Sequence, residues 1–192
     1  MALIQLYKAR TVRSGLYSGW KRYLCTNDTM LRMKERDITH LDAVEFLVDE
    51  VLTLITKQES VGATVIALEG DLGTGKTTFT QILAKKLGVT ETVTSPTFML
   101  MKVYELPGVD SFTYSDERAY KQLVHADVYR IEEVDEMRVL GFEKLLAEKR
   151  IIICIEWADK IATLLPADAI HLRFSLEGER RSVTIQTPDN ES

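Results

Sequence analysis

The amino-acid sequence predicts a three-layer α/β sandwich built on a mixed sheet, parallel at its centre and antiparallel at its margins. Two mostly apolar runs, Thr64–Glu69 and Ile151–Ile155, are typical of strands in the middle of a sheet with both faces covered. The C-terminal region alternates apolar and polar residues, which is typical of a half-exposed antiparallel hairpin. Since buried strands need helices over both faces, the expected domain has three layers.

Two helices are expected to flank the first of these strands. The earlier helix is expected to begin near Thr39, because Thr39 and Asp42 resemble a capping box. Its apolar residues recur at helical spacing, and they are Leu41, Val44, Leu47, Val48, Val51, Leu52 and Ile55. The later helix is expected from Thr77 to Leu87, with Gly88 at its C-terminal end.

Strands and short helices alternate in the second half of the chain. Phe98–Leu106 and Leu123–Tyr129 are expected to be strands, and the single loop that joins them, Pro107–Tyr120, favours an antiparallel pair. Two short helices are expected over Glu132–Arg138 and Glu143–Lys149. The apolar residues of the terminal hairpin are Ile170, Leu172, Phe174, Leu176, Val183 and Ile185, with Gly178 at its turn.

The 192-residue chain is long enough for one domain, which we place at residues 36–188. Residues 1–35 form a basic head without helical or strand period, where we expect a disordered extension. An organelle transit peptide, or an upstream start codon with translation from Met30 or Met33, are the alternatives. No run approaches the roughly 20 apolar residues of a membrane-spanning helix. Cys25 and Cys154 give no disulfide framework. We therefore expect a cytoplasmic protein with no membrane partner.

The charge of the chain is unevenly distributed. The whole chain has a net charge of −5, whereas residues 1–27 hold five basic residues and no acidic one, so residues 28–192 carry −10. Lysine and arginine contacts to phosphates dominate nucleic-acid binding. A domain this acidic is a poor candidate for holding RNA or DNA by itself, and we expect any nucleic acid to be held by another subunit.

The strongest functional motif lies between the first central strand and the helix that follows it. Residues Gly70–Thr77 satisfy the pattern G-x-x-x-x-G-K-[ST], in the strand–loop–helix context that the pattern requires. Its glycines let backbone N–H groups point at phosphate oxygens, Lys76 can reach the β- and γ-phosphates, and the Thr77 hydroxyl can bind magnesium. The motif predicts ATP and Mg²⁺ binding on a P-loop NTPase-like fold. The expected nucleotide contacts are Asp71, Leu72, Gly73, Thr74, Gly75, Lys76, Thr77 and Thr78.

An acidic residue ends the second apolar run. In P-loop enzymes, a carboxylate at the tip of a neighbouring parallel strand holds magnesium or orients the attacking water. Glu156 fits this position, because no other apolar run downstream of the loop ends in an acid. Glu69 is its nearest competitor, but the phosphate loop itself follows there. We therefore expect Glu156 to act at the phosphate site, either by holding magnesium or by orienting the attacking water.

Two further groups of polar residues lie between these strands. Ser95 and Thr97 begin the predicted hairpin, where a hydroxyl could sense the γ-phosphate as a switch segment does. His125, Asp127 and Tyr129 project from one face of a strand, because side chains alternate along it. The residue types alone leave open whether this row is functional or a polar sheet edge, and they do not predict a zinc site.

Taken in order, these motifs resemble the TsaE family, also called YjeE, over about residues 37–186. The segments that carry the resemblance are Gly70–Thr78, Ser95–Phe98, His125–Arg130, Leu140–Phe142 and Ile155–Trp157. The resemblance implies an ATPase that serves the TsaB–TsaD heterodimer, which makes threonylcarbamoyladenosine at position 37 of tRNAs reading ANN codons. It also implies that TsaD holds the tRNA, and that slow ATP turnover resets the complex between cycles.

The resemblance also implies roles for individual residues. Thr77 and Glu156 become magnesium ligands, with Lys76 as the phosphate lysine. The residues implied in turnover, switching or partner contacts are Asp127, Ser95, Thr97, Tyr129 and Trp157. Thr39 occupies a plausible position for contacting the adenine. The loop at 107–120 is longer than the family usually has and the basic head is extra, so both could alter partner contacts.

Three other functions remain open at this point. A small-molecule or nucleoside kinase would also use this loop, but it needs an arginine-bearing lid, and the arginines after the loop are scattered, with only Arg180 and Arg181 adjacent. A GTP-driven switch is disfavoured because no Asn-Lys-x-Asp-type element is present. A non-enzymatic interaction domain could use Leu140–Leu146 as a partner face, although buried Leu and Phe are more often core residues.

Overall fold

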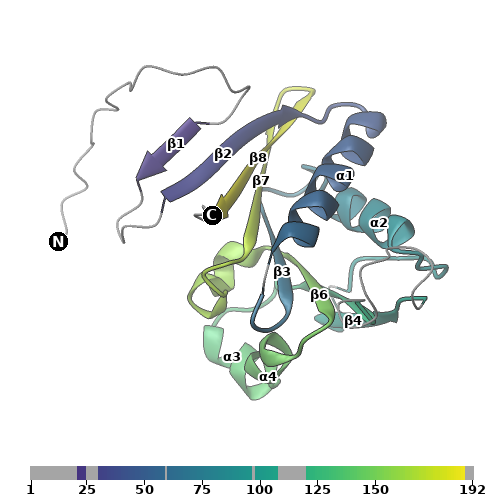
Figure 1. Cartoon of the computed structure of the whole chain (residues 1–192), viewed down its shortest axis with the longest axis vertical. Coiled ribbons are helices and arrows are strands. Elements are labelled where there is room, and N and C mark those ends of the chain that lie inside the picture. Colours follow the sequence, from purple (N-terminus) through teal and green to yellow (C-terminus); the bar gives the residue numbers. More distant parts are fainter. Residues whose placement is uncertain (1–20, 25–29, 59, 97, 108–119, 189–192) are drawn as a thin grey trace.

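A single sheet organises the structure. The computed structural model describes residues 21–24, 30–58, 60–96, 98–107 and 120–188 (Figure 1). Within this part, eight strands lie in the order β1-β2-β8-β7-β3-β6-β5-β4. The strands are β1 (Lys21–Leu24), β2 (Met30–Asp37), β3 (Thr64–Glu69), β4 (Met101–Glu105), β5 (Gln122–Asp127), β6 (Ile151–Glu156), β7 (Ile170–Glu177) and β8 (Arg180–Pro188). The helices are α1 (Leu41–Lys57), α2 (Lys76–Lys86), α3 (Val134–Val139), α4 (Phe142–Ala147) and the 3₁₀ helix η1 (Ala158–Leu164).

The pairing of the strands confirms the predicted mixed sheet. β3 pairs in parallel with β6 on one side and with β7 on the other, and β6 pairs in parallel with β5. The outer pairs, β4 with β5, β7 with β8, β8 with β2 and β2 with β1, are antiparallel. The predicted hairpins of the second half are therefore correct. The carboxyl ends of β3, β5 and β6 all lie at one edge of the sheet.

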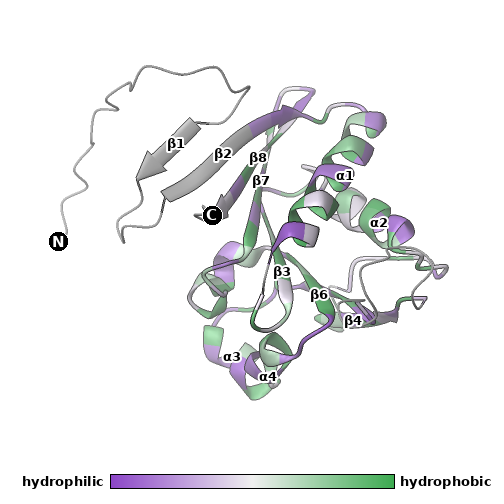
Figure 2. Cartoon of the chain, in the orientation of Figure 1, coloured by the Kyte–Doolittle hydropathy of each residue, from purple (hydrophilic) through white to green (hydrophobic). Residues whose placement is uncertain are grey.

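Side chains along the central strands point alternately to the two faces of the sheet, so the core consists of two clusters. On β3, Ile66 and Leu68 pack into the cluster that contains the buried residues of α1 and α2. Val65 and Ala67 point to the other face, where they pack with buried residues of α3, α4 and η1. Figure 2 shows the hydrophobic colouring concentrated on these central elements, such as β6. The two clusters confirm the predicted three-layer sandwich.

Two helix starts differ from the prediction, the first because of a long-range contact and the second because of a local cap. The N-cap of α1 is His40, and Thr39 does not cap the helix. The Thr39 hydroxyl instead accepts a hydrogen bond from the backbone N–H of Arg181 at 3.1 Å. α3 begins at Val134 because the Glu136 carboxylate accepts the backbone N–H groups of Glu132 and Glu133, both at 2.9 Å, which closes a capping box around Glu133.

The N-terminal region contains strands that the sequence analysis did not predict. Within the expected extension 1–35, the structure describes β1 and most of β2, and β2 pairs with β8 from Leu31 to Asp37. The sequence of β2, MLRMKERD, mixes charged and apolar residues without clean alternation. Residues 1–20 and 25–29 lie outside the described part, and so does most of the predicted loop, at 108–119. In the described part, no helix has the length and apolar character to cross a membrane.

The packing of α1 can be tested with two neighbouring residues. Leu47 is 2% exposed and faces the sheet, whereas Phe46 is 73% exposed on the outer face of the same helix. Leu47→Ala is expected to lower the free energy of unfolding by about 2–5 kcal/mol, because it removes buried methyl groups and leaves a cavity. Phe46→Ala should change it by less than about 0.5 kcal/mol. Urea denaturation of both variants measures the difference, and equal losses would contradict the assigned orientation of α1.

Candidate functional site

The loop Gly70–Gly75 connects β3 to α2 and depends on glycine. Gly70 has a φ of 123° and Gly75 a φ of 110°, in the region that side chains rarely allow. A Cβ atom built on Gly70 would lie 2.2 Å from the carbonyl oxygen of Phe174. The loop is therefore wrapped tightly against β7. Thr74 is 1% exposed and donates its hydroxyl to the carbonyl of Asp71 at 2.8 Å, so it braces the loop from inside.

Lys76 is held at the mouth of this loop. Its Nζ donates to the carbonyl oxygens of Gly70 at 2.6 Å and Asp71 at 2.7 Å, and it lies 4.1 Å from the centre of the Trp157 ring. Burial lowers the pKa of Lys76, and the nearby carboxylates of Glu156 and Asp127 oppose this shift. These carboxylates favour the charged ammonium, so a cation is placed where the loop's N–H groups and the start of α2 converge.

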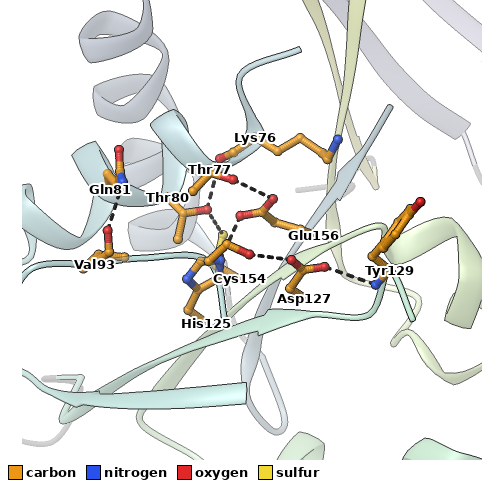
Figure 3. A network of polar contacts seen from close by, with 11 residues as sticks. Lys76, Thr77, Thr80, Gln81, Val93, His125, Asp127, Tyr129, Cys154 and Glu156 are labelled. Carbon is orange, nitrogen blue, oxygen red and sulfur yellow. Dashed lines mark hydrogen bonds and ion pairs between the residues drawn. The ribbon is translucent and has the colours of Figure 1, made fainter. Parts of the chain in front are cut away.

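Glu156 connects this helix to two strands. The Thr77 hydroxyl, in the first turn of α2, donates to Oε2 of Glu156 at 2.9 Å. Nε2 of His125, on β5, lies 2.9 Å from Oε1 of the same carboxylate. Glu156 is 3% exposed and His125 is fully buried. Figure 3 shows the carboxylate between these two partners. Both of its oxygens are thus hydrogen-bonded, one toward the phosphate loop and one toward the sheet.

Asp127 lies beside Glu156, because the two residues are register partners at the ends of parallel β5 and β6. Its Oδ1 accepts the backbone N–H of Tyr129 at 3.1 Å, and its Oδ2 accepts the Ser95 hydroxyl at 2.6 Å. The segment before Ser95 is also tied to α2, since the Gln81 side chain donates to the carbonyl of Val93 at 2.9 Å (Figure 3). Asp127 therefore joins the predicted switch segment to the end of β5.

Two aromatic residues border the site. Trp157 follows Glu156 directly and has a φ of 62°, a left-handed conformation that is uncommon outside glycine. The rings of Trp157 and Tyr129 lie 5.0 Å apart between centroids. Tyr129 is 52% exposed. The turn after β6 thus directs the indole over the Lys76 ammonium and leaves the tyrosine at the surface.

The structure brings most of the predicted site residues together. Those that meet at the carboxyl ends of β3, β5 and β6 are Lys76, Thr77, Glu156, Asp127, Ser95, Tyr129 and Trp157. Asp71, Leu72, Gly73, Thr74 and Gly75 form the loop, and Thr78 lies in the first turn of α2. Thr39 stands apart from these residues, and it contacts the backbone of Arg181, whose Nε donates to the carbonyl of Gly73 in the loop at 3.5 Å. Thr97 lies outside the described residues.

Two contacts were not predicted from the sequence. Arg181 touches the loop from the β7–β8 hairpin, and nothing local to its sequence marks this long-range contact. His125 was recognised as part of a polar row, but its hydrogen bond to Glu156 was not predicted. The alternation that places His125 and Asp127 on one face of β5 was the available signal, because Glu156 ends the neighbouring strand.

Glu69, the competing acid, is engaged elsewhere. Its Oε1 lies 2.9 Å from Nδ1 of His171, and its Oε2 accepts two hydrogen bonds from Arg173 at 3.0 and 3.1 Å. The hydrogen bond from His171 is the main cause that lowers the pKa of Glu69, partial burial opposes it, and Arg173 adds to the lowering. This carboxylate therefore stabilises the β3–β7 pair.

The oxygens of Thr77 and Glu156 are of the kind that could hold a magnesium ion. Among the described residues, no group of three or more His, Cys, Asp or Glu side chains is placed to hold a metal ion. Magnesium is usually bound by one or two protein oxygens plus phosphates and waters. The Thr77 hydroxyl and the Glu156 carboxylate lie 2.9 Å apart in a hydrogen bond, so one ion could contact both oxygens.

Comparison with known proteins identifies the family. Residues 38–183 match the family model of the threonylcarbamoyl adenosine biosynthesis protein TsaE. The tRNA threonylcarbamoyladenosine biosynthesis protein TsaE of Bacillus subtilis is 37% identical over 127 residues, covering 66% of this chain and 71% of that protein. The protein of the same name from Treponema pallidum is 33% identical, covering 60% and 77%. The crystal structure of Bacillus subtilis YdiB has the same fold, with a TM-score of 0.56 at 24% identity over 84% of this chain and 89% of that one.

The Glu69 interactions predict a pH dependence of stability. Because its pKa is lowered on folding, the carboxylate contributes stability above its unfolded pKa of about 4.3, and this contribution is lost as the pH falls through the folded pKa. Glu69→Gln should lower the free energy of unfolding by about 1–2 kcal/mol at pH 7 and flatten its decline below about pH 5. Urea denaturation across pH measures this. The exposed Glu45→Gln should leave the profile unchanged, and an identical acid decline in both variants would contradict the assignment.

Proposed function

Because this chain belongs to the TsaE family of threonylcarbamoyl adenosine biosynthesis proteins, we propose that it is a magnesium-dependent ATPase that hydrolyses ATP to ADP and phosphate. In this proposal it serves a TsaB–TsaD complex that installs N6-threonylcarbamoyl on adenosine 37 of tRNAs reading ANN codons. Turnover is slow without the partners and resets the complex. The observation that carries the proposal is the Thr77–Glu156 contact beside the phosphate loop, which joins α2 to the end of β6.

The nucleotide is held mainly by the loop. Backbone N–H groups from Asp71 to Gly75 and the N-terminus of α2 face the phosphates, as in other strand–loop–helix sites. Lys76, at the mouth of the loop, pairs with the β- and γ-phosphate oxygens as a point charge. Thr39 and Arg181 lie on the β8 side of the loop, and we place the adenosine on that side.

Thr77 and Glu156 hold the magnesium ion in this proposal. When bound, the ion would supply positive charge that stabilises the negative charge developing as the γ-phosphorus separates from the oxygen bridging it to the β-phosphate. Glu156 also orients the attacking water, because its carboxylate faces the loop while staying nearly buried. Lys76 stabilises the charge that develops on the transferred phosphoryl group. Asp127 supports turnover by holding Ser95, so that the switch segment can respond to the γ-phosphate.

The partner surface lies next to this switch segment. Phe98 and Met99 are 86% and 66% exposed, and the Arg130 guanidinium lies 4.2 Å from the centre of the Phe98 ring. Tyr129 extends this surface toward Trp157. Exposed aromatic side chains and arginine are typical of the central contacts in protein interfaces. Because the domain is acidic, its charge disfavours binding of the tRNA phosphates. In this proposal the partner complex holds the tRNA, and the contact of this chain with tRNA is indirect.

The kinase alternative is not favoured. The family model covers the catalytic loop and both magnesium-ligand candidates, and the relatives described above are biosynthesis proteins of threonylcarbamoyladenosine rather than kinases.

The first test replaces the lysine of the loop. Lys76→Ala should reduce ATP hydrolysis at least about 100-fold, because it removes the cation that stabilises phosphoryl charge. Lys85→Ala, on the exposed side of the last turn of α2, is the matched control and should hydrolyse ATP at the wild-type rate. Release of phosphate with Mg²⁺ and with EDTA measures both. Wild-type turnover in Lys76→Ala, or in EDTA, would refute the proposed magnesium-dependent ATP site.

The second test concerns the partners. The full chain, loaded with ATP or with ADP, is used to capture a purified TsaB–TsaD heterodimer, and the captured amount is expected to differ between the two nucleotides. Phe98→Ala should weaken capture at least about tenfold, since interface aromatics contribute about 2 kcal/mol or more. Phe46→Ala, at a position 73% exposed on α1, should bind like wild type. If the captured amount is the same with ATP and ADP and is unchanged by Phe98→Ala, this partner surface is refuted, whereas the proposed ATP site is not.

A further inference from the structure

His125 occupies an unusual place for a polar side chain. It is 0% exposed, on the central strand β5, opposite Cys154 of β6. Its neighbours along β5, Val124 and Ala126, point to the other face and pack into the apolar core there. Burying an imidazole costs free energy unless it is hydrogen-bonded. The hydrogen bond that His125 makes is to Oε1 of Glu156 at 2.9 Å.

We propose that His125 is the positioning residue of the site: it fixes the Glu156 carboxylate so that the other oxygen stays beside Thr77. This inference rests on the proposed function, because it assigns Glu156 to the metal ion. The carboxylate group of a glutamate rotates easily about its last torsion. Here His125 holds one oxygen of Glu156 and Thr77 holds the other (Figure 3). The two hydrogen bonds together define the plane of the carboxylate group.

Removing the hydrogen bond from His125 would release the carboxylate. Oε1 would become a nearly buried charged oxygen without its donor, which is costly. The Lys76 ammonium is close enough to interact electrostatically with Glu156. A released carboxylate would therefore turn toward Lys76 and away from Thr77, so that the two metal ligands would no longer be held 2.9 Å apart.

The other ring nitrogen supports a donating role for Nε2. Among the described residues, Nδ1 of His125 has no hydrogen-bond partner. In the tautomer with the proton on Nδ1, a buried donor would lack an acceptor, and the lone pair of Nε2 would face the carboxylate. The tautomer with the proton on Nε2 avoids both unfavourable contacts. His125 thus presents an N–H to Glu156, as the outer partners of metal-binding groups commonly do.

Two amide substitutions of His125 distinguish a role in positioning Glu156 from a role in core packing. His125→Gln can place its amide N–H near the position of Nε2, whereas the shorter His125→Asn places its amide near Nδ1. Calorimetric titration of the full-length variants with ADP, first in EDTA and then over a series of Mg²⁺ concentrations, measures metal binding without turnover. Thermal unfolding of each variant monitors the fold.

The expected result is a selective loss of metal affinity. His125→Asn should raise the half-saturating Mg²⁺ concentration about 10–100-fold, the usual effect of removing an outer partner of a metal ligand. ADP affinity in EDTA should stay within about twofold in every variant, and His125→Gln should recover most of the loss. Equal Mg²⁺ dependence in wild type, His125→Asn and His125→Gln would overturn the inference. If wild type itself shows no Mg²⁺ dependence, it is the proposed function that fails.

A second measurement does not depend on the stability of the variants. In ¹⁵N-labelled wild-type protein, the Nε2–H proton of His125 should give a slowly exchanging, downfield NMR signal, because it is buried and bonded to a carboxylate. Glu156→Gln should move this signal upfield, whereas Asp127→Asn should leave it in place. An Nδ1-bound proton, or a signal that does not respond to Glu156→Gln, would overturn the assignment.

Discussion

The site depends on the parallel pairing of β6 with β3 and β5. This pairing aligns the carboxyl ends of the three strands, so that the phosphate loop, Asp127 and Glu156 emerge at one edge of the sheet. Parallel strands are usually buried on both faces, and here two apolar clusters cover them. The rigidity of the centre of the sheet thus sets the spacing between a residue of α2 and a residue of β6, 79 positions apart in the sequence.

Much of this arrangement follows from the sequence, because its signals are local. The apolar run before Gly70 and the run before Glu156 predict the central strands, and the glycine pattern predicts the loop between strand and helix. The carboxyl ends of parallel strands meet at one edge, so the meeting of the phosphate loop with Glu156 could be anticipated from the two predicted central strands, whereas the role of Asp127 stayed open.

The features that the sequence did not predict depend on contacts between residues far apart in the chain, which local sequence patterns do not indicate. Thr39 was expected to cap α1, but β8 places the backbone N–H of Arg181 within reach of its hydroxyl. β2 was not predicted because it gains its hydrogen bonds from β8, at the other end of the chain. His125 was ambiguous for the same reason: an alternating polar row indicates a face of the strand, but not which neighbour lies across from it.

The left-handed turn at Trp157 has an optical consequence. The chain contains two tryptophans, and the indole of Trp157 lies tilted beside the Tyr129 ring, with its centre 4.1 Å from the Lys76 ammonium. The emission of an indole responds to a nearby cation and to the polarity around the ring. The turn that follows Glu156 therefore builds a fluorophore into the site, so that any movement of Lys76 or Tyr129 registers as a change in the protein's own fluorescence.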